Sequence, residues 1–554
     1  MKLSGAEIII NLLERQGIDT IAGIPGGSNL PLYNALYKSK VIKHILVRQE
    51  QAGGFLAQGM ARSTGKTAVC FATSGPGAVN LITAIADARL DSIPIVAITG
   101  QVGHSLIGTD AFQEIDTYGM TVPITKCNFL VRSAAELLTV IPEAFRIAAS
   151  GRPGPVLIDV PKDVQIQQVE FNTWPQPGKK DDAPAFDNTL LKKAAEMINE
   201  AKRPVIYAGG GAMYADMSKE IIKLAEKSNI PTTVTLMGLG LMPHDHPLYL
   251  GMLGMHGARY TNNIVHESDL LIALGVRFDD RATGKLAEFC PNAKVVHIDI
   301  DKSEIGKLRK PQIGIVGDLA SMLPSLIEMV SANKREDWIS KVQGEIKKYP
   351  WSSQNAEDGM HPLELIRKIA DAANDDAIVT TDVGQHQMWV AQGYPMKHPR
   401  TLLSSGGLGT MGFGLPAALG AARANPEKQV ICFTGDGSIL MNIQEFATLD
   451  EHKLNVKIIL FNNGHLGLVR QQQELFFEKN YMASVFKSNP NFSAIADGFG
   501  IKAYDVSTID ELMVTLPQVM SENGPALVNI CVDHAHNVLP MVPPGAANLQ
   551  MIGG

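Results

Sequence analysis

The stretch QVICFTGDG at residues 429–437 decides the fold expected for this chain. Its apolar run predicts a buried strand that ends in the tight turn Gly435-Asp436-Gly437. A second apolar run, VKIILFNN at 456–463, ends with Asn462-Asn463, and 24 residues separate this pair from Gly437. The segment between them has the apolar spacing of a helix, so the three pieces predict one βαβ unit. Asp436 and Asn463 are then expected at the carboxyl ends of neighbouring parallel strands, where open α/β sheets bind ligands.

Asp436 and Asn463 supply a carboxylate and an amide oxygen. Such oxygens suit a hard divalent cation such as Mg²⁺, which takes few protein ligands beside phosphate oxygens and water. The alternative is an ordinary strand-end turn followed by an Asx turn. The spacing resembles the thiamine diphosphate-binding signature of enzymes that use this coenzyme. It therefore predicts a coenzyme and a metal ion, but no particular reaction.

The composition is that of a large globular enzyme. The chain has 554 residues, 45 % hydrophobic and 19 % charged, which predicts three or four domains with full cores. The net charge is −7 and no basic tract occurs, so nothing favours a nucleic-acid partner. No signal segment and no apolar span of about 18 residues is found, so we expect a cytoplasmic location and no membrane partner.

Strand-like and helix-like segments alternate along the chain in three blocks. This alternation predicts an α/β fold with three doubly wound parallel-sheet domains. Polar linkers at 171–187 and 349–359 separate the blocks. The predicted domains are 1–166, 188–345 and 360–534, followed by a Pro- and Gly-rich tail at 535–554. Strands are expected within 19–25, 44–47, 67–73, 94–100 and 155–161, then 204–211, 231–235, 269–275 and 294–300, then 377–384, 429–437, 456–463 and 526–533.

Glu50 follows the predicted strand at 44–47 and begins a helix. An acid there can simply stabilise the helix dipole. With a thiamine diphosphate site elsewhere in the chain, it can also face the pyrimidine N1′, so that the 4′-amino group becomes the imine that removes the C2 proton. We therefore expect Glu50 to be both a coenzyme-binding and a catalytic residue.

Long stretches of the chain resemble the large, catalytic subunit of the acetohydroxyacid (acetolactate) synthase family, and the resemblance covers essentially the whole chain. It implies pyruvate and 2-oxobutanoate as substrates: pyruvate is decarboxylated, and its two-carbon unit is transferred to a second 2-oxoacid. The matching stretches are GIPGGS (23–28), RQEQAGGFLAQGMAR (48–62), SGPGAVNL (74–81), DARLDSIPIVAITGQV (87–102), IGTDAFQE (107–114), GRPGPVLIDVPKDV (151–164), RFDDRATGKL (277–286), SSGGLGTMGFGLPAA (404–418), GDGS (435–438) and MVPPGAAN (541–548).

In this family the coenzyme lies between the first domain of one subunit and the third domain of another, so the resemblance implies a homodimer or tetramer. Asp436, Asn463 and the main-chain carbonyl of His465 would hold Mg²⁺. The diphosphate would lie on the turn that contains Gly435, Gly437 and Ser438. Gly409 and Met411 would contact the aminopyrimidine. Their segment, 406–412, also satisfies GxGxxG, but it does not open a βαβ unit, which disfavours a nicotinamide site.

The resemblance also places residues of the first domain beside the reacting carbon. Gly26 and Gly27 would form the wall over the thiazolium. Phe112, Gln113 and Lys162 would lie next to the substrate, with Gln113 and Lys162 as catalytic residues. Each of the last three has a plainer alternative: Phe112 in the core, Gln113 on a helix surface, and Lys162 as a solvated loop charge.

The central block resembles the family's FAD domain. Glycines after the strand PVIYA (204–208) would let the backbone approach a diphosphate. The residues implied in flavin binding are Arg152, Gly209, Gly210, Gly211, Thr235, Leu236, Met237, Met255, His256, Gly275, Arg277, Asp299, Ile300 and Asp318. Arg281 would bind the carboxylate of the second 2-oxoacid, because its planar fork suits bidentate binding. Its alternative is an ion pair with Asp279 or Asp280.

One departure from the family pattern concerns the choice of acceptor. Gln472 stands where the family commonly has Trp, which presses on the extra methyl of 2-oxobutanoate. Its loss predicts a weaker preference for 2-oxobutanoate over pyruvate. The alternative functions are a flavin-dependent pyruvate oxidase, a flavin-free catabolic synthase, and a non-catalytic protein on the same fold. A small regulatory subunit is a further partner that the resemblance suggests.

Overall fold

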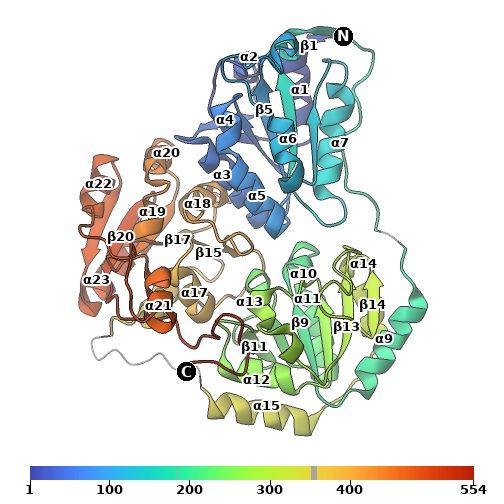
Figure 1. The fold of residues 1–554 in the computed structure, drawn as a ribbon, viewed down its shortest axis with the longest axis vertical. Helices are drawn as coiled ribbons and strands as arrows, with labels where there is room; N and C mark the ends of the chain where they lie inside the picture. The colour runs from blue at the N-terminus through green and yellow to red at the C-terminus, as the bar shows by residue number, and fades with distance from the viewer. Residues whose placement is uncertain (184, 351–358, 554) are drawn as a thin grey trace.

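The computed structural model describes residues 1–183, 185–350 and 359–553. Within them the chain forms three six-stranded sheets whose strands all run parallel, each covered by helices (Figure 1). A small antiparallel pair, β1 (Lys2–Ser4) with β8 (Gln168–Glu170), closes the N-terminal region. The predicted fold of three doubly wound parallel sheets is confirmed. The limits of the domains stay predictions, and most of the linker predicted at 349–359 falls outside the described residues.

The N-terminal sheet has the strand order β3-β2-β4-β5-β7-β6. Its first helix begins at a capping box, where the Glu7 N–H donates to Ser4 Oγ over 3.3 Å and the Ser4 N–H donates to Glu7 Oε2 over 3.0 Å. The strands are β2 (Thr20–Gly23), β3 (Lys43–Leu46), β4 (Ala68–Ala72), β5 (Ile95–Gln101), β6 (Cys127–Leu130) and β7 (Val156–Pro161). The helices are α1 (Gly5–Arg15), α2 (Leu30–Tyr37), α3 (Glu50–Thr64), α4 (Pro76–Asn80), α5 (Ile82–Asp91), α6 (Thr117–Thr121), α7 (Leu137–Ala149) and α8 (Lys162–Ile166).

The C-terminal sheet has the order β16-β15-β17-β18-β20-β19, so its six strands repeat the arrangement of the N-terminal sheet. The strands are β15 (Ile378–Thr381), β16 (Leu402–Leu403), β17 (Val430–Gly435), β18 (Val456–Asn462), β19 (Lys502–Val506) and β20 (Ala526–Cys531). The helices are α16 (Pro362–Ala372), α17 (Gln385–Gly393), α18 (Gly414–Ala424), α19 (Asp436–Ile439), α20 (Phe446–Glu451), α21 (Gly467–Phe476), α22 (Phe492–Gly498) and α23 (Ile509–Ser521).

The βαβ unit predicted around the GDG turn is present, since β17 and β18 are parallel neighbours. Its connection is not the single helix that the apolar spacing predicts. It consists of α19, a 3₁₀ turn at Ile443–Glu445, and α20. The break falls at Asn442, whose side-chain amide donates to the Gly412 carbonyl over 2.6 Å and so draws this turn towards another loop.

The central sheet has the order β11-β10-β9-β12-β13-β14. Numbered within the region, this is 3-2-1-4-5-6, the order of sheets that bind dinucleotides where the strand order reverses. The strands are β9 (Pro204–Ala208), β10 (Thr232–Val234), β11 (Tyr249–Met252), β12 (Leu270–Leu274), β13 (Lys294–Asp299) and β14 (Ile313–Val316). The helices are α9 (Asn188–Glu200), α10 (Gly210–Tyr214), α11 (Ser218–Ser228), α12 (Arg259–Glu267), α13 (Asp280–Thr283), α14 (Leu319–Met329) and α15 (Glu336–Lys348).

Helices α3 and α18 lie side by side and join the N-terminal and C-terminal regions (Figure 1). Glycines permit the close approach: a Cβ added at Gly59 would lie 2.1 Å from the Ala417 carbonyl oxygen, and one at Gly420 would lie 2.0 Å from the Leu56 carbonyl oxygen. Phe55 and Phe413 pack edge to face beside them. The two regions are therefore held in one fixed relation within the chain.

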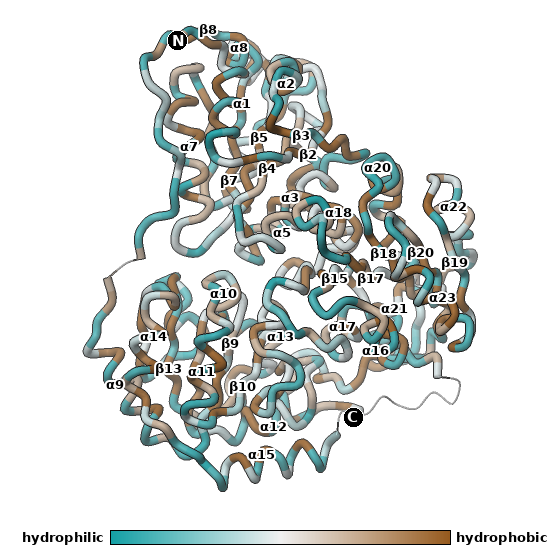
Figure 2. Tube along the Cα trace, turned by 180° about the vertical axis from the view of Figure 1, so that it is seen from behind, coloured by the Kyte–Doolittle hydropathy of each residue, from teal (hydrophilic) through white to brown (hydrophobic). Residues whose placement is uncertain are grey.

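Apolar side chains fill the space between each sheet and its helices, and brown segments in Figure 2 mark interior strands such as β9 and β13. The predicted tail packs as well: Val538, Met541 and Val542 are buried, and the Val542 N–H donates to the Met255 carbonyl over 2.8 Å. Of the helices in the described part of the chain, none is long and apolar enough to cross a membrane.

Candidate active site

The carboxyl edge of the C-terminal sheet holds a buried carboxylate. Asp436 begins α19, and its Oδ2 accepts the Gly464 N–H over 2.7 Å and the Asn489 side-chain amide over 3.0 Å. Its Oδ1 accepts the Gly437 N–H over 2.9 Å. Burial raises the pKa of Asp436, and these hydrogen bonds oppose the rise. Because Gly464 directly follows Asn463, Asp436 lies against the loop that carries the second predicted ligand.

The loop after β18 contains the predicted ligands Asn463 and His465. Asn463 Oδ1 accepts the His465 N–H over 3.0 Å, and His465 Nδ1 hydrogen-bonds the Asn463 carbonyl over 2.7 Å. The His465 ring stacks on His534, with ring centroids 4.6 Å apart. Among the described residues, no group of three or more His, Cys, Asp or Glu side chains is placed to hold a metal. One carboxylate, one amide oxygen and a main-chain carbonyl fit Mg²⁺ beside phosphate oxygens instead.

Two buried residues beside this edge were not predicted from the sequence. Asp382, which follows β15, accepts the Gly412 and Gly414 N–H groups over 2.8 and 3.2 Å, and burial raises its pKa to about 6. His386 lies behind the GDG turn: a Cβ added at Gly435 would lie 2.9 Å from its Nδ1. Burial lowers the pKa of His386 to about 3, so the ring is neutral. The signal available in the sequence was the polar run after AIVTT, on the strand that neighbours β17.

The carboxyl edge of the N-terminal sheet gathers three predicted residues around the turn at 73–77. Glu50 is half-buried at the first position of α3, and Asn80 donates to its Oε2 over 2.9 Å. A Cβ at Gly77 would lie 3.3 Å from Glu50 Oε1, and one at Gly26 would lie 2.6 Å from Thr73. A Cβ at Gly75 would lie 2.8 Å from the Gln113 carbonyl oxygen. Gly26, Glu50 and Gln113 therefore surround one turn.

The other predicted residues of this region are on the surface of the chain. Phe112 is 88 % exposed, so the alternative of a core residue is wrong. Gln113 has a φ of +58° and belongs to no helix, so the alternative of a helix-surface residue is also wrong. Gly27 is exposed, and so is Lys162, at the start of α8. Phe112 and Lys162 thus have space beside them for a ligand or a second chain.

Among the described residues, no hydrogen bond or ion pair joins Glu50 to Asp436 or Asn463 within one chain. The contacts of Glu50 stay within the N-terminal region, and those of Asp436 and Asn463 stay within the C-terminal region. The structure therefore holds two half-sites, one with a half-buried acid and one with a carboxylate and an amide oxygen of the kind that Mg²⁺ prefers.

A cavity of about 920 Å³ lies where the three regions meet. Thirteen of the fourteen residues predicted to bind flavin line it, together with Arg281, Gly409 and Gln472. The exception, Gly209, caps α10 and packs so tightly that a Cβ there would lie 2.6 Å from the Gly275 carbonyl oxygen. Gly209 and Gly275 follow β9 and β12, the two strands between which the strand order reverses. The cavity thus occupies the position where this sheet type binds a dinucleotide.

Two arginines at this cavity, Arg152 and Arg281, lie beside carboxylates. Arg152 Nη1 lies 2.6 Å from Glu304 Oε1 and 3.2 Å from Asp301 Oδ2. Burial raises the pKa of Asp299 to about 6. The Arg281 side chain is 67 % exposed and lies 3.7 Å from Asp280 Oδ2, so the ion pair considered as its alternative is present while the residue still faces the cavity. Glu304 and Asp301 were not predicted.

Comparison with known protein families assigns these regions. Three thiamine pyrophosphate enzyme models match: the N-terminal TPP binding domain over residues 3–120, the central domain over 191–326, and the C-terminal TPP binding domain over 382–530. The two half-sites thus fall in the two TPP binding domains, and the cavity borders the central domain.

Individual relatives are similar over the whole chain. The acetolactate synthase isozyme 1 large subunit of Escherichia coli is 55 % identical over 552 residues, which cover 100 % of this chain and 98 % of that protein. The isozyme 2 large subunit of the same organism is 44 % identical over 550 residues, 99 % of each chain. A probable acetolactate synthase large subunit of Methanocaldococcus jannaschii is 45 % identical over 98 % of this chain and 94 % of its own length. The chain therefore belongs to the acetolactate synthase large-subunit family of thiamine pyrophosphate enzymes.

Proposed function

We propose that this protein is an acetolactate synthase. It decarboxylates pyruvate and joins the remaining two-carbon unit to a second pyruvate, giving 2-acetolactate, or to 2-oxobutanoate, giving 2-aceto-2-hydroxybutanoate. This would be the first common step of branched-chain amino acid biosynthesis. The observation that carries the proposal is the full-length similarity to acetolactate synthase large subunits, in a chain that has Glu50 at one TPP-domain edge and Asp436 at the other.

The C-terminal half-site is proposed to bind Mg²⁺ and the diphosphate of the coenzyme. Asp436, the Asn463 amide oxygen and the His465 carbonyl would hold the ion, with Gly435, Gly437 and Ser438 against the diphosphate. Oxygen ligands and the N–H groups around Asp436 support this assignment. When bound, thiamine diphosphate supplies a nucleophilic carbon and an electron sink.

The N-terminal half-site is proposed to control protons. Glu50 would hold a proton at the pyrimidine N1′, since its half-buried carboxylate accepts an amide hydrogen bond at Oε2 and, among the described residues, none at Oε1. Gly409, at a φ of +70° that suits glycine, would accept the 4′-amino group at its carbonyl. Met411 would keep the coenzyme bent. Gly26, Gly27, Phe112, Gln113 and Lys162 would surround the reacting substrate.

A homodimer or tetramer would complete each site. Among the described residues of one chain, Glu50 forms no hydrogen bond with Asp436, and large apolar side chains stand exposed near both half-sites. Phe112 is 88 % exposed, Met441 is 52 % exposed and Met482 is 80 % exposed. Covering such side chains with a second copy is favourable, and a second copy would bring a half-site of each kind together.

The central cavity is proposed to bind FAD as a structural cofactor, since the reaction has no net redox change. The dinucleotide-type strand order, the glycine contacts of β9 and β12, and the cavity lining all support this. Arg281 and Gln472 would meet the second 2-oxoacid at the cavity wall. The name "large subunit" of the relatives suggests a small partner for this chain as well. A cytoplasmic location stays a prediction.

The test is to incubate the purified chain with pyruvate, thiamine diphosphate and Mg²⁺, with and without FAD, and to identify the product. Stoichiometric acetolactate without oxygen uptake supports the proposal. Peroxide formation or flavin reduction would identify a pyruvate oxidase instead. Full activity in a preparation free of flavin would identify a flavin-free synthase.

A further inference from the structure

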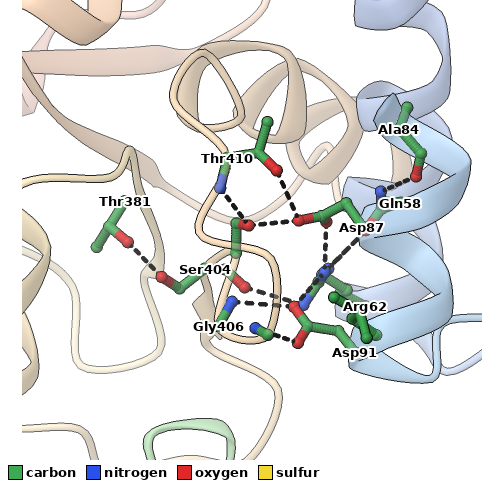
Figure 3. A network of polar contacts seen from close by, with 12 residues as sticks. Gln58, Arg62, Ala84, Asp87, Asp91, Thr381, Ser404, Gly406 and Thr410 are labelled. Atoms are coloured by element: carbon green, nitrogen blue, oxygen red, sulfur yellow. Dashed lines mark hydrogen bonds and ion pairs between the residues drawn. The ribbon is translucent and has the colours of Figure 1, made fainter. Parts of the chain in front are cut away.

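A buried ion cluster ties the N-terminal region to a loop of the C-terminal region (Figure 3). Arg62, near the end of α3, places Nη2 2.9 Å from Asp91 Oδ2 and 3.2 Å from Asp87 Oδ2, both on α5. The side chains of Arg62, Asp87 and Asp91 are 4 %, 0 % and 0 % exposed. One cation thus faces two carboxylates out of contact with water.

Gln58 on α3 accepts two further hydrogen bonds from Arg62, and the loop at 404–410 uses other donors and acceptors of the cluster. Asp91 accepts the N–H groups of Gly406 and Gly407 over 3.0 and 2.7 Å. Asp87 accepts the hydroxyls of Ser405 and Thr410.

Arg62 completes these contacts by donating to the Ser404 carbonyl over 3.0 Å. The shape of the loop is therefore set by side chains that come from another domain.

The fit around the loop leaves little freedom. A Cβ added at Gly407 would lie 2.9 Å from both Asp91 Oδ1 and Leu90 Cβ. At the far end of the loop, Asp382 holds the Gly412 and Gly414 N–H groups. The segment between these anchors contains Gly409 and Met411, and its residues Leu408 and Gly409 line the central cavity.

Stability alone is a weak reason for such a cluster. Removing charges from water is costly, and replacing a buried ion group by apolar side chains often leaves a protein as stable or more so. Here burial raises the pKa of Asp87, which shows that its charge is held against a desolvation cost. What the ions provide is directed hydrogen bonding to five points of one loop.

We propose that Arg62, Asp87 and Asp91 are positioning residues for the coenzyme. They hold the loop at 404–410 in the shape that presents Gly409 and Met411 to the aminopyrimidine. This inference rests on the proposed function. It also gives α3 two roles: Glu50 at its first residue would serve one active site, and Arg62, roughly 18 Å further along, would serve the loop of another.

Asp91→Asn in the full-length holoenzyme tests this inference. The amide keeps the shape of the carboxylate but has one acceptor oxygen and one NH₂ group, so the N–H of Gly406 or Gly407 would face a donor. We expect the thiamine diphosphate concentration for half-maximal activity to rise about tenfold. We also expect exchange of the C2 proton of bound thiamine diphosphate with D₂O to slow about tenfold, because the 4′-amino group loses its aligned acceptor.

Asp269→Asn is the matched control. Asp269 accepts two consecutive N–H groups, those of Lys202 and Arg203, each over 2.9 Å, but it lies in the central region away from the coenzyme. Asp269→Asn should lower the melting temperature and leave the thiamine diphosphate requirement and the C2 exchange rate unchanged. Unaltered C2 exchange in Asp91→Asn, or equal changes in both variants, would overturn the inference.

If Asp91→Asn does not fold, Ser405→Ala replaces it. That change removes only the hydroxyl that binds Asp87 and accepts the Thr410 N–H, and the same two measurements apply. A smaller loss in the same direction supports the inference, and unchanged values refute it. A wild-type protein that makes no acetolactate would instead refute the proposed function.

Discussion

The N-terminal and C-terminal sheets share one strand order but end in different chemistry. At the C-terminal edge, Asp436 is buried and its two oxygens accept two N–H groups and an amide. At the N-terminal edge, Glu50 is half-buried and accepts a hydrogen bond from Asn80. The common topology fixes where a ligand can bind, at the carboxyl ends of the strands. The polar groups at those ends decide whether the edge suits a metal and a phosphate or a proton.

This difference predicts that the two edges can be disabled separately. Damage at the Glu50 edge should affect the reaction more than coenzyme binding, and damage at the Asp436 edge should do the reverse.

Glu50→Gln is expected to have the largest effect. The amide cannot hold the proton that the pyrimidine N1′ requires, so kcat should fall about 10²- to 10⁴-fold while the coenzyme still binds. Steady-state kinetics and coenzyme titration measure the two separately. Glu7→Gln is the control, because Glu7 is also an acid in the first turn of a helix in this region. Equal, small losses in both variants would show that Glu50 merely stabilises its helix.

Asp436→Asn should impair the half-site at the C-terminal edge. Losing the one carboxylate of the proposed metal set should raise the Mg²⁺ concentration for half-maximal activity at least about 100-fold, since changes to second-layer groups already cost 10- to 100-fold. Activity at saturating Mg²⁺ should recover in large part. Asp505→Asn is the control: Asp505 lies on the outer strand β19, where it binds Ser493 and Asn529. An unchanged Mg²⁺ requirement in Asp436→Asn would contradict the assignment.

The same comparison shows what the sequence could predict. Asp436 and Asn463 are joined through a single βαβ unit, so local patterns suffice to place them together. The contact between Asp91 and the Gly407 N–H joins residues 316 positions apart, and no local sequence pattern predicts it. Strands β6, β11, β14, β16 and β19 of the three sheets and the small pair β1 and β8 were also missed. Strand β16 has only two residues, and β19 contains the charged residues Lys502 and Asp505. The helix after the GDG turn is broken where Asn442 donates a hydrogen bond to the distant Gly412 carbonyl. The spacing of apolar residues in the sequence does not reveal this bond.

Gly275→Ala tests the central region, which has the dinucleotide strand order that the other two lack. Gly275 has a φ of +60°, and a Cβ there would lie 2.6 Å from the Ala212 nitrogen. We expect the amount of FAD bound per chain to fall roughly tenfold. The added Cβ would strain the glycine contact at the strand-order reversal by about 1–3 kcal/mol and force the two backbone segments apart. Gly251→Ala is the control, with a φ of +76° and nothing within 4 Å. Flavin absorbance per chain measures both, and full flavin content in Gly275→Ala would contradict the proposed site.

Gln472→Trp should have the smallest effect, since it touches neither half of the coenzyme site. Gln472 is exposed at the wall of the central cavity on α21, one turn after Leu468, which also lines the cavity. A Trp would pack over Leu468 and offer apolar surface to the extra methyl of 2-oxobutanoate, which is worth about tenfold in selectivity. Product ratios with pyruvate and 2-oxobutanoate in competition measure it, and Gln472→Leu separates the ring from mere apolarity. If the wild-type protein already strongly favours 2-oxobutanoate, Gln472 does not set the preference, and the acceptor must be selected by other residues of the cavity such as Arg281.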